Sequence, residues 1–167
     1  SFRQKFEEDE AFVCYTIPYT YADLQTYLGR IADHPLITVE SLGKTKDGHD
    51  LPLVTVADKP ECDDILFLIC REDGDEPTSN CALEGLIDHI TAGEDPLLVR
   101  MLQRCTLKIV PMVAIDAVII GSPYGGPYDV MARRWMDEKP LPEIARIKEA
   151  LEGWLQSGAV RLIAKLH

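Results

Sequence analysis

The amino-acid sequence predicts an α/β protein with a mixed, mostly parallel β-sheet that carries helices on both faces. Two short apolar runs, 65–70 and 107–113, are typical of strands buried on both sides. A segment with helical spacing of its apolar residues lies between them, and strands joined by helical crossovers build sheets of this kind. The 167 residues, 46% of them hydrophobic, suffice for one domain with a sizeable core.

The N-terminal part of the chain predicts one helix followed by a β-hairpin. The helix is expected over 21–32, where apolar residues recur at helical spacing, and Thr20 with Asp23 can cap its start. Two strands are expected over 36–41 and 51–57. An Asp-Gly pair between them is typical of a hairpin turn.

Strands and helices alternate in the rest of the chain. In order, we expect a strand over 65–70, a helix over 79–92, a short helix from 96 to 104, a strand over 107–113, a Gly- and Pro-rich loop over 121–128, a helix over 143–156 and a strand over 159–166. Gly93 is a suitable residue to end the first of these helices, and Asp95-Pro96 is a typical helix start. The inward face of the last helix is expected to carry Ile144, Ile147, Leu151, Trp154 and Leu155.

The composition argues against two kinds of partner. Twenty-eight acidic and 17 basic residues give a net charge of −11, which disfavours binding to nucleic acid or to anionic membranes. No run approaches the roughly 18 apolar residues of a membrane span. The five cysteines contain no CxxC pair, and the charged first residues are unlike a secretory signal. We therefore expect the cytoplasm or another reducing intracellular compartment.

Three residues that can bind a metal follow two of the expected strands. Asp73 and Glu76 come after the 65–70 strand, and His167 comes directly after the 159–166 strand. If these strands are neighbours, their carboxyl ends meet at one edge of the sheet. Two carboxylates and one imidazole would then form a three-ligand set with an open fourth position. The alternative is a solvated acidic turn and a terminal histidine without a chemical role.

Four segments resemble the zinc carboxypeptidase family (M14), over nearly the whole chain. They are Tyr19-Thr20-Tyr21-Ala22-Asp23-Leu24, Glu40-Ser41-Leu42-Gly43-Lys44-Thr45, Arg71-x-x-Gly74-Asp75-Glu76-Pro77 and Val110-Pro111-Met112-Val113. The 17–21 segment, after Phe6-Glu7-Glu8-Asp9, is similar to the cytosolic carboxypeptidase branch, in which it joins a small β-sandwich to the catalytic domain. The resemblance implies that residues 1–18 end an N-terminal β-rich segment or linker. It also implies that 19–167 form the N-terminal half of a carboxypeptidase-like α/β domain.

The resemblance implies a zinc site as well. The family's ligands are a His-x-x-Glu motif and a second histidine, and by position Glu76 matches the glutamate and His167 the second histidine. Asp73 stands where the family has its first histidine. Two carboxylates on one metal make its bound water less acidic, so an occupied site should be a poorer generator of hydroxide. We expect zinc as a possible cofactor whose binding is weakened or absent. Arg71 and Arg133 match substrate-binding positions, and Arg133 would bind the substrate's terminal carboxylate.

Other positions depart from the family. The arginine that polarises the scissile carbonyl would fall near Tyr124, and Ala132 replaces an asparagine beside Arg133. No residue matches the general-base glutamate or the tyrosine that follow the second histidine in the family. Loss of one transition-state stabiliser typically costs about 10²–10³ in rate. We therefore assign no catalytic residue.

Resemblance and departures together favour a metallocarboxypeptidase-like protein that is catalytically impaired and acts as a binding or structural subunit. It would then bind a protein partner or a peptide C-terminus. One alternative is an active zinc metallocarboxypeptidase that removes acidic C-terminal residues and carries its general base on a C-terminal part outside this sequence. A further alternative is a small-molecule amidohydrolase on the same scaffold, against which the segment Pro18-Tyr19-Thr20-Tyr21 counts.

Overall fold

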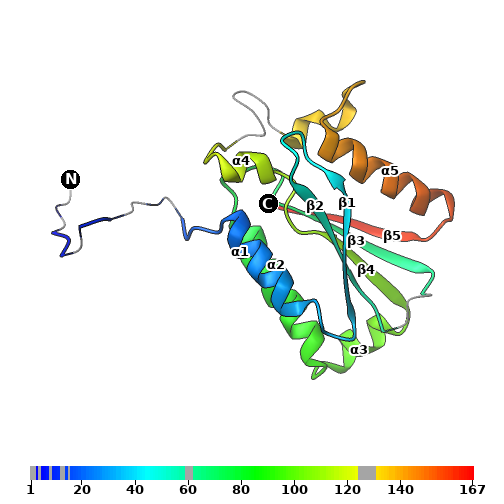
Figure 1. Ribbon diagram of the computed structural model, residues 1–167. Helices are drawn as coiled ribbons and strands as arrows, with labels where there is room; N and C mark the ends of the chain where they lie inside the picture. The colour runs from blue at the N-terminus through cyan, green and yellow to red at the C-terminus, as the bar shows by residue number, and fades with distance from the viewer. Residues whose placement is uncertain are drawn as a thin grey trace.

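A computed structural model describes residues 3, 5–7, 9–11, 14, 16–58, 62–123 and 131–167, without the side chains of 131 and 132. Its helices are α1 (Tyr21–Ile31), α2 (Thr78–Ala92), α3 (Pro96–Leu102), α4 (Ile115–Ile119), the 3₁₀ helix η1 (Met131–Met136) and α5 (Pro142–Gln156) (Figure 1). Its strands are β1 (Ile37–Lys44), β2 (Asp50–Val56), β3 (Asp64–Cys70), β4 (Cys105–Val110) and β5 (Val160–Leu166). The described parts of 1–18 hold no helix or strand, and the predicted boundary there stays a prediction.

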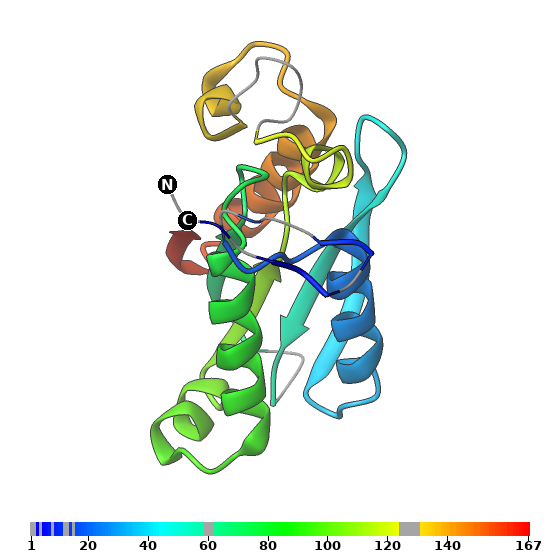
Figure 2. The same cartoon turned by 90° about the vertical axis from the view of Figure 1, so that its left-hand side faces the viewer.

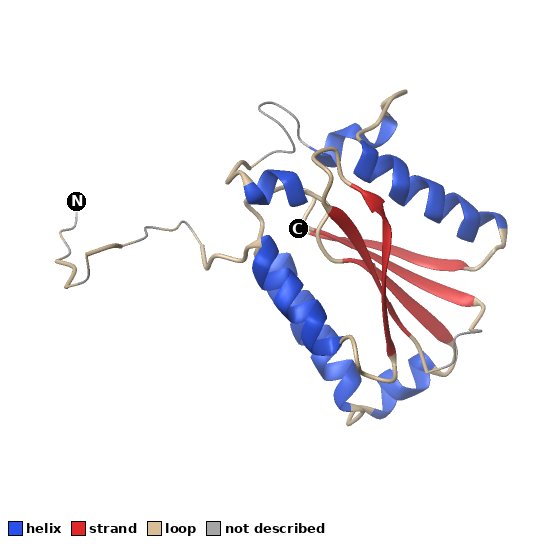
Figure 3. Ribbon diagram, viewed as in Figure 1, coloured by secondary structure: helices blue, strands red, loops and turns tan. Residues whose placement is uncertain are grey.

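The described strands form one mixed sheet in the order β1-β2-β4-β3-β5 (Figure 3). The predicted hairpin is β1 paired with β2, and β2 also pairs antiparallel with β4. β3 pairs in parallel with β4 on one side and with β5 on the other. The predicted α/β class with a mixed sheet is confirmed, and its parallel pairings lie in the β4-β3-β5 half. The carboxyl ends of β3 and β5 therefore lie at the same edge.

Helices cover both faces of the sheet, as predicted. α1 and α2 lie side by side on one face, and α5 lies on the other (Figures 1 and 2). An ion pair joins Arg30 of α1 to Asp88 of α2, with 3.0 Å between Nη2 and Oδ2. On the opposite face the ring of Trp154 in α5 meets Phe67 of β3 edge-on, with 5.2 Å between ring centroids. No helix in the described ranges is long and apolar enough to cross a membrane.

The predicted helix ends have local causes that the structure shows. The Asp23 amide donates to the Thr20 hydroxyl at 3.2 Å, and the Thr20 amide donates to Asp23 Oδ2 at 2.7 Å, which completes a capping box. Gly93 follows α2 in the left-handed conformation, at φ 68°. Asp95 Oδ1 accepts the amide of Leu97 at 2.8 Å and so caps α3.

The structure corrects three expectations. β4 begins two residues before the predicted 107–113 strand and ends at Val110, because Pro111 has no amide to donate to a ladder. The short helix α4 lies in a segment for which we expected no element. Leu155 was placed on the inward face of α5 but is 52% exposed, while Ile144 and Ile147 are buried as predicted.

Two buried carboxylates fasten the β1–β2 turn to the rest of the molecule. Asp116 in α4 accepts the Thr45 hydroxyl at 2.7 Å and the Asp47 amide at 2.9 Å. Glu143 in α5 accepts the Lys46 amide at 2.9 Å. Glu143 is 1% exposed, and its Oε2 has no hydrogen-bond partner among the described residues. Burial raises the pKa of Glu143, and the charge of Asp116 raises it further, against the lowering effect of the Lys46 amide.

Candidate metal centre

The candidate centre lies where β3 and β5 end. Cys70, the last residue of β3, is paired with Leu166, the last residue of β5. The Arg71 amide then donates to the Leu166 carbonyl at 3.3 Å and extends the contact by one residue. Because the strands are parallel neighbours, residues that follow them emerge at the same edge of the sheet. His167 and the 71–77 loop are thereby held close together.

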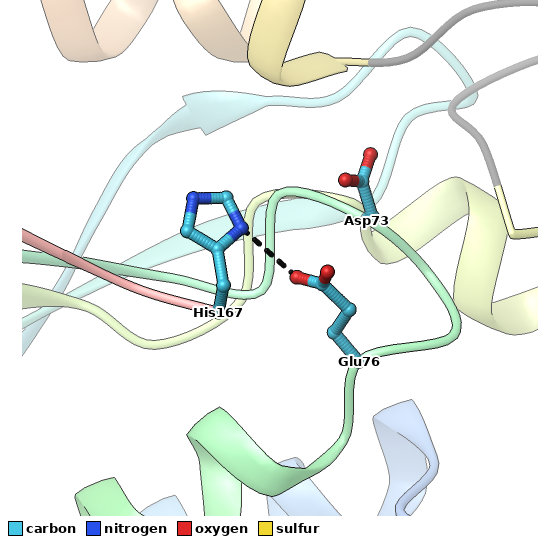
Figure 4. A group of neighbouring side chains, drawn as sticks. All are labelled: Asp73, Glu76 and His167. Carbon is cyan, nitrogen blue, oxygen red and sulfur yellow. Dashed lines mark hydrogen bonds and ion pairs between the residues drawn. The ribbon is translucent and has the colours of Figure 1, made fainter.

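The structure brings Asp73, Glu76 and His167 together (Figure 4). One ligand atom from each lies within 4.8 Å of the others. Nδ1 of His167 is 3.0 Å from Oε2 of Glu76. Within the described residues, Glu76 and His167 line a hollow of about 410 Å³. The proximity that we expected if the two strands are neighbours is present, and the role of these residues as metal ligands stays a prediction.

The Asp73 carboxylate lies in a setting that suits a cation. Its Oδ1 is buried and has no hydrogen-bond partner among the described residues. Burial raises the pKa of Asp73, and the negative charges of Glu76 and Asp75 raise it further, while His167 lowers it. A divalent cation between Asp73, Glu76 and His167 would supply the missing partner and offset the repulsion. Two oxygen donors and one imidazole nitrogen are a donor set that zinc accepts.

Arg71 shapes the loop that carries these carboxylates. Its backbone is in the left-handed region, at φ 52°, a strained conformation for a residue other than glycine. Its guanidinium donates to the carbonyls of Tyr19 and Gly74, at 2.8 and 2.7 Å, and to Asn80 Oδ1 at 3.1 Å. The residue is 4% exposed, and burial lowers the pKa of its guanidinium. These contacts give Arg71 an organising role, and its predicted contact with substrate remains untested.

Gly74 allows the loop to pass close to another segment. A Cβ atom on Gly74 would lie 2.1 Å from the carbonyl oxygen of Ser122. The Gly74 amide donates to the Pro123 carbonyl at 2.7 Å. A side chain at this position would push the 71–77 loop away from 122–123, so glycine is required by the close approach rather than by a positive φ.

Glu72 is a site residue that sequence reasoning missed. Its side chain is 1% exposed, and Lys165 Nζ donates to its Oε1 at 3.0 Å. The indole N–H of Trp135 donates to the same oxygen. Its Oε2 lies 3.6 Å from Nε2 of His167. In the sequence, Glu72 is only one more acid in an acidic loop. The one feature that hinted at its role is Lys165, a cation two positions before His167, which could pair with an acid of that loop.

The structure describes only some of the other predicted site positions. Arg133 lies in η1 and is exposed. The position near Tyr124, where the family's polarising arginine would fall, lies outside the described residues, as does the side chain of Ala132. The predicted role of Arg133 as a carboxylate-binding residue is therefore untested.

Fold and site define a protein with a candidate metal centre at the carboxyl edge of a mixed α/β/α sheet. The model of the zinc carboxypeptidase family, Peptidase_M14, matches residues 24–136, and the chain belongs to this family. Human cytosolic carboxypeptidase 6 is 27% identical over 158 residues, which cover 87% of this chain and 31% of that protein. Mouse cytosolic carboxypeptidase 4 is 28% identical over 131 residues, or 69% of this chain and 12% of that protein.

Solved structures share the fold. The metallo-carboxypeptidase of Burkholderia cenocepacia superimposes with a TM-score of 0.80 at 22% identity, over 90% of this chain and 41% of that chain. The metallo-carboxypeptidase of Pseudomonas aeruginosa gives a TM-score of 0.77 at 21% identity, over 90% of this chain and 40% of that one. The chain thus spans less than half of these solved chains and under a third of the two cytosolic carboxypeptidases.

Proposed function

We propose that the chain is a metal-binding, metallocarboxypeptidase-like module that holds one divalent cation, by preference zinc, and has little hydrolytic activity of its own. The observation that carries the proposal is the convergence of Asp73, Glu76 and His167, together with the buried Oδ1 of Asp73, which has no hydrogen-bond partner among the described residues. A metal bound there would polarise a carbonyl group and acidify water. The chain's own residues would hold the cation and present the open side of the site to a peptide C-terminus.

Impairment follows from the residues around the site. Asp73 replaces a neutral imidazole with a charged carboxylate, which lowers the Lewis acidity of any metal held there. The buried Arg71 already donates to three protein acceptors, so it is committed to the loop. The exposed Arg133 remains as a cation that could hold a terminal carboxylate. We therefore propose binding of a protein partner or an acidic peptide end rather than efficient hydrolysis.

The proposal also includes the domain boundary near residue 19 and the cellular compartment. Residues 1–18 would lead from a neighbouring segment into a domain that begins at 19. All five cysteines are free in the structure, and Cys70 is buried. Together with relatives named cytosolic carboxypeptidases, these free thiols support a reducing intracellular compartment.

Hydrolysis is the second candidate function, favoured by the same convergence of ligands and by carboxypeptidase relatives. To separate the two, this chain and the full-length natural protein are each incubated with zinc and with peptides ending in glutamate, and release of the last residue is followed by mass spectrometry. We expect release at the level of a zinc-only blank. Metal-dependent release that disappears in Glu76→Gln would overturn the impairment and favour the active enzyme.

A further inference from the structure

We propose that Glu72 is a positioning residue for the metal centre: its buried carboxylate takes the Nε2–H of His167 and so turns Nδ1 toward the cation shared with Asp73 and Glu76. The inference rests on the proposed function, because it assigns a role around that cation. It concerns a residue outside the predicted ligand set.

Glu72 is fixed from two sides. Lys165, from β5, donates to Oε1 at 3.0 Å, and the Trp135 indole, from η1, donates to the same atom. The ammonium of Lys165 also lies over the Trp135 ring, 4.4 Å from its centroid. A carboxylate held by a cation and an indole N–H in a buried setting has little freedom to turn. Its position is therefore defined before any metal arrives.

The second oxygen of this carboxylate faces the histidine. Oε2 of Glu72 has no hydrogen-bond partner among the described residues and lies 3.6 Å from Nε2 of His167. The other ring nitrogen, Nδ1, lies 3.0 Å from Glu76. The two ring nitrogens of His167 thus lie next to two different carboxylates, Nδ1 next to Glu76 and Nε2 next to Glu72. A small movement of the ring would make the Nε2–H···Oε2 hydrogen bond.

This arrangement matches what a metal-bound histidine needs. Such a residue commonly donates its second N–H to a carboxylate, which fixes the tautomer and the ring orientation and raises the basicity of the ligating nitrogen. His167 is 44% exposed, so packing alone does not hold its ring. Glu72 does not belong to the group of described residues whose ligand atoms converge, and its Oε2 lies next to Nε2 of His167, so we assign it to the histidine rather than to the cation.

The test combines zinc titration calorimetry with ¹⁵N NMR of the His167 ring, assigned with His167→Gln, on the 167-residue chain. We expect Glu72→Gln to bind zinc about 10–100-fold more weakly than the wild type. In the wild type loaded with zinc, Nε2 should carry the proton, and its signal should move in Glu72→Gln. Trp135→Phe removes one donor to Glu72 and should weaken zinc binding by a smaller factor. Glu149→Gln, at a surface ion pair on α5, is the matched control and should change neither readout.

The outcomes separate the two claims. Zinc binding by the wild type with equal affinity in a folded Glu72→Gln, and unchanged His167 ring signals, would overturn the positioning role and leave the proposed function standing. Absence of zinc binding by the wild type would overturn the proposed function and this inference with it. If Glu72→Gln does not fold, Trp135→Phe decides by the same two readouts.

Discussion

Asp73 is the residue on which the chemistry of the site depends. By the resemblance of the sequence it matches the position of the family's first histidine, and its Oδ1 is buried without a hydrogen-bond partner among the described residues. Its proximity to His167 could be predicted only on the condition that the two preceding strands are neighbours, because side chains after neighbouring parallel strands share one edge. Glu72 could not be predicted, because its burial depends on Trp135 and Lys165 folding over it.

Replacing Asp73 with histidine should strengthen zinc binding. A neutral imidazole removes one of two repelling charges and restores the family's ligand types, so we expect a gain of about tenfold or more in affinity, or ~1.4 kcal/mol. Zinc calorimetry of Asp73→His against the wild type measures this. Asp33→His, at an exposed position just after the C-terminal end of α1, is the control and should leave the affinity unchanged. Equal affinities of Asp73→His and wild type would show that position 73 is not a ligand.

Arg71 and Arg133 should differ in what their loss does to stability. Arg71→Met removes hydrogen bonds to three acceptors and leaves them buried, so we expect a loss of about 2–4 kcal/mol in the free energy of unfolding. Arg133→Met, at an exposed position, should change it by less than about 0.5 kcal/mol. Urea denaturation followed by circular dichroism measures both. If Arg71→Met is as stable as the wild type, Arg71 does not organise the loop, and the predicted substrate-binding role becomes the better explanation.

At the element scale, ends that depend on local chemistry were predictable and ends set by tertiary contacts were not. Thr20 with Asp23 and the glycine at 93 mark helix ends in the sequence itself. Pro111 marks the end of β4 in the sequence too, whereas the start of α4 follows the Val113 and Ala114 amides, which donate to the Arg71 carbonyl across the sheet edge. The turn between β1 and β2 was predicted, whereas its attachment to α4 and α5 through buried carboxylates was not.

That attachment predicts a pH dependence. The raised pKa of Glu143 means that the folded state binds a proton more tightly than the unfolded state does. The contribution of protonated Glu143 to the free energy of unfolding is therefore complete below the ordinary glutamate pKa. It is lost as pH rises through the raised pKa of Glu143 in the folded state. Glu143→Gln mimics the protonated form, so it should be nearly neutral near pH 4. As pH rises from the ordinary pKa to the raised one, the variant should become more stable than the wild type, with a slope of at most about 1.4 kcal/mol per pH unit.

Urea denaturation at a series of pH values, wild type against Glu143→Gln, measures this difference. Glu152→Gln, an exposed position on the same helix, serves as the control and should show a flat difference across the series. A Glu143→Gln difference that is equally flat, or that favours the wild type as pH rises, would show that Glu143 is not a raised-pKa carboxyl in the folded protein.

At the scale of the whole molecule, the sequence predicted the layers but not the order of the strands. Apolar runs and helical periodicity define which segments cross the core, and the match to carboxypeptidase structures agrees with that arrangement. The placement of β4 between β2 and β3 follows from packing among distant segments. β5 ends the described sheet, pairs with β3 alone, and exposes half of Leu162 and 43% of Ile163.

The exposed edge predicts self-association of this 167-residue chain. An apolar edge strand with unpaired backbone groups is a template for another strand. We expect light scattering after size exclusion to show a mass that rises with concentration, and Ile163→Lys to reduce that rise. Leu97→Lys, which removes an exposed apolar side chain far from β5 in the sequence, is the control. A monomer at all concentrations would show that this edge is protected.

The central claim is that Asp73, Glu76 and His167 bind one divalent cation together, and zinc titration of the intact chain tests it most directly. The account predicts a single zinc site whose affinity falls at least about tenfold in Glu76→Gln and in His167→Gln, each measured beside the Glu149→Gln control. Zinc binding that survives both substitutions unchanged, or no zinc binding by the wild type, would contradict it.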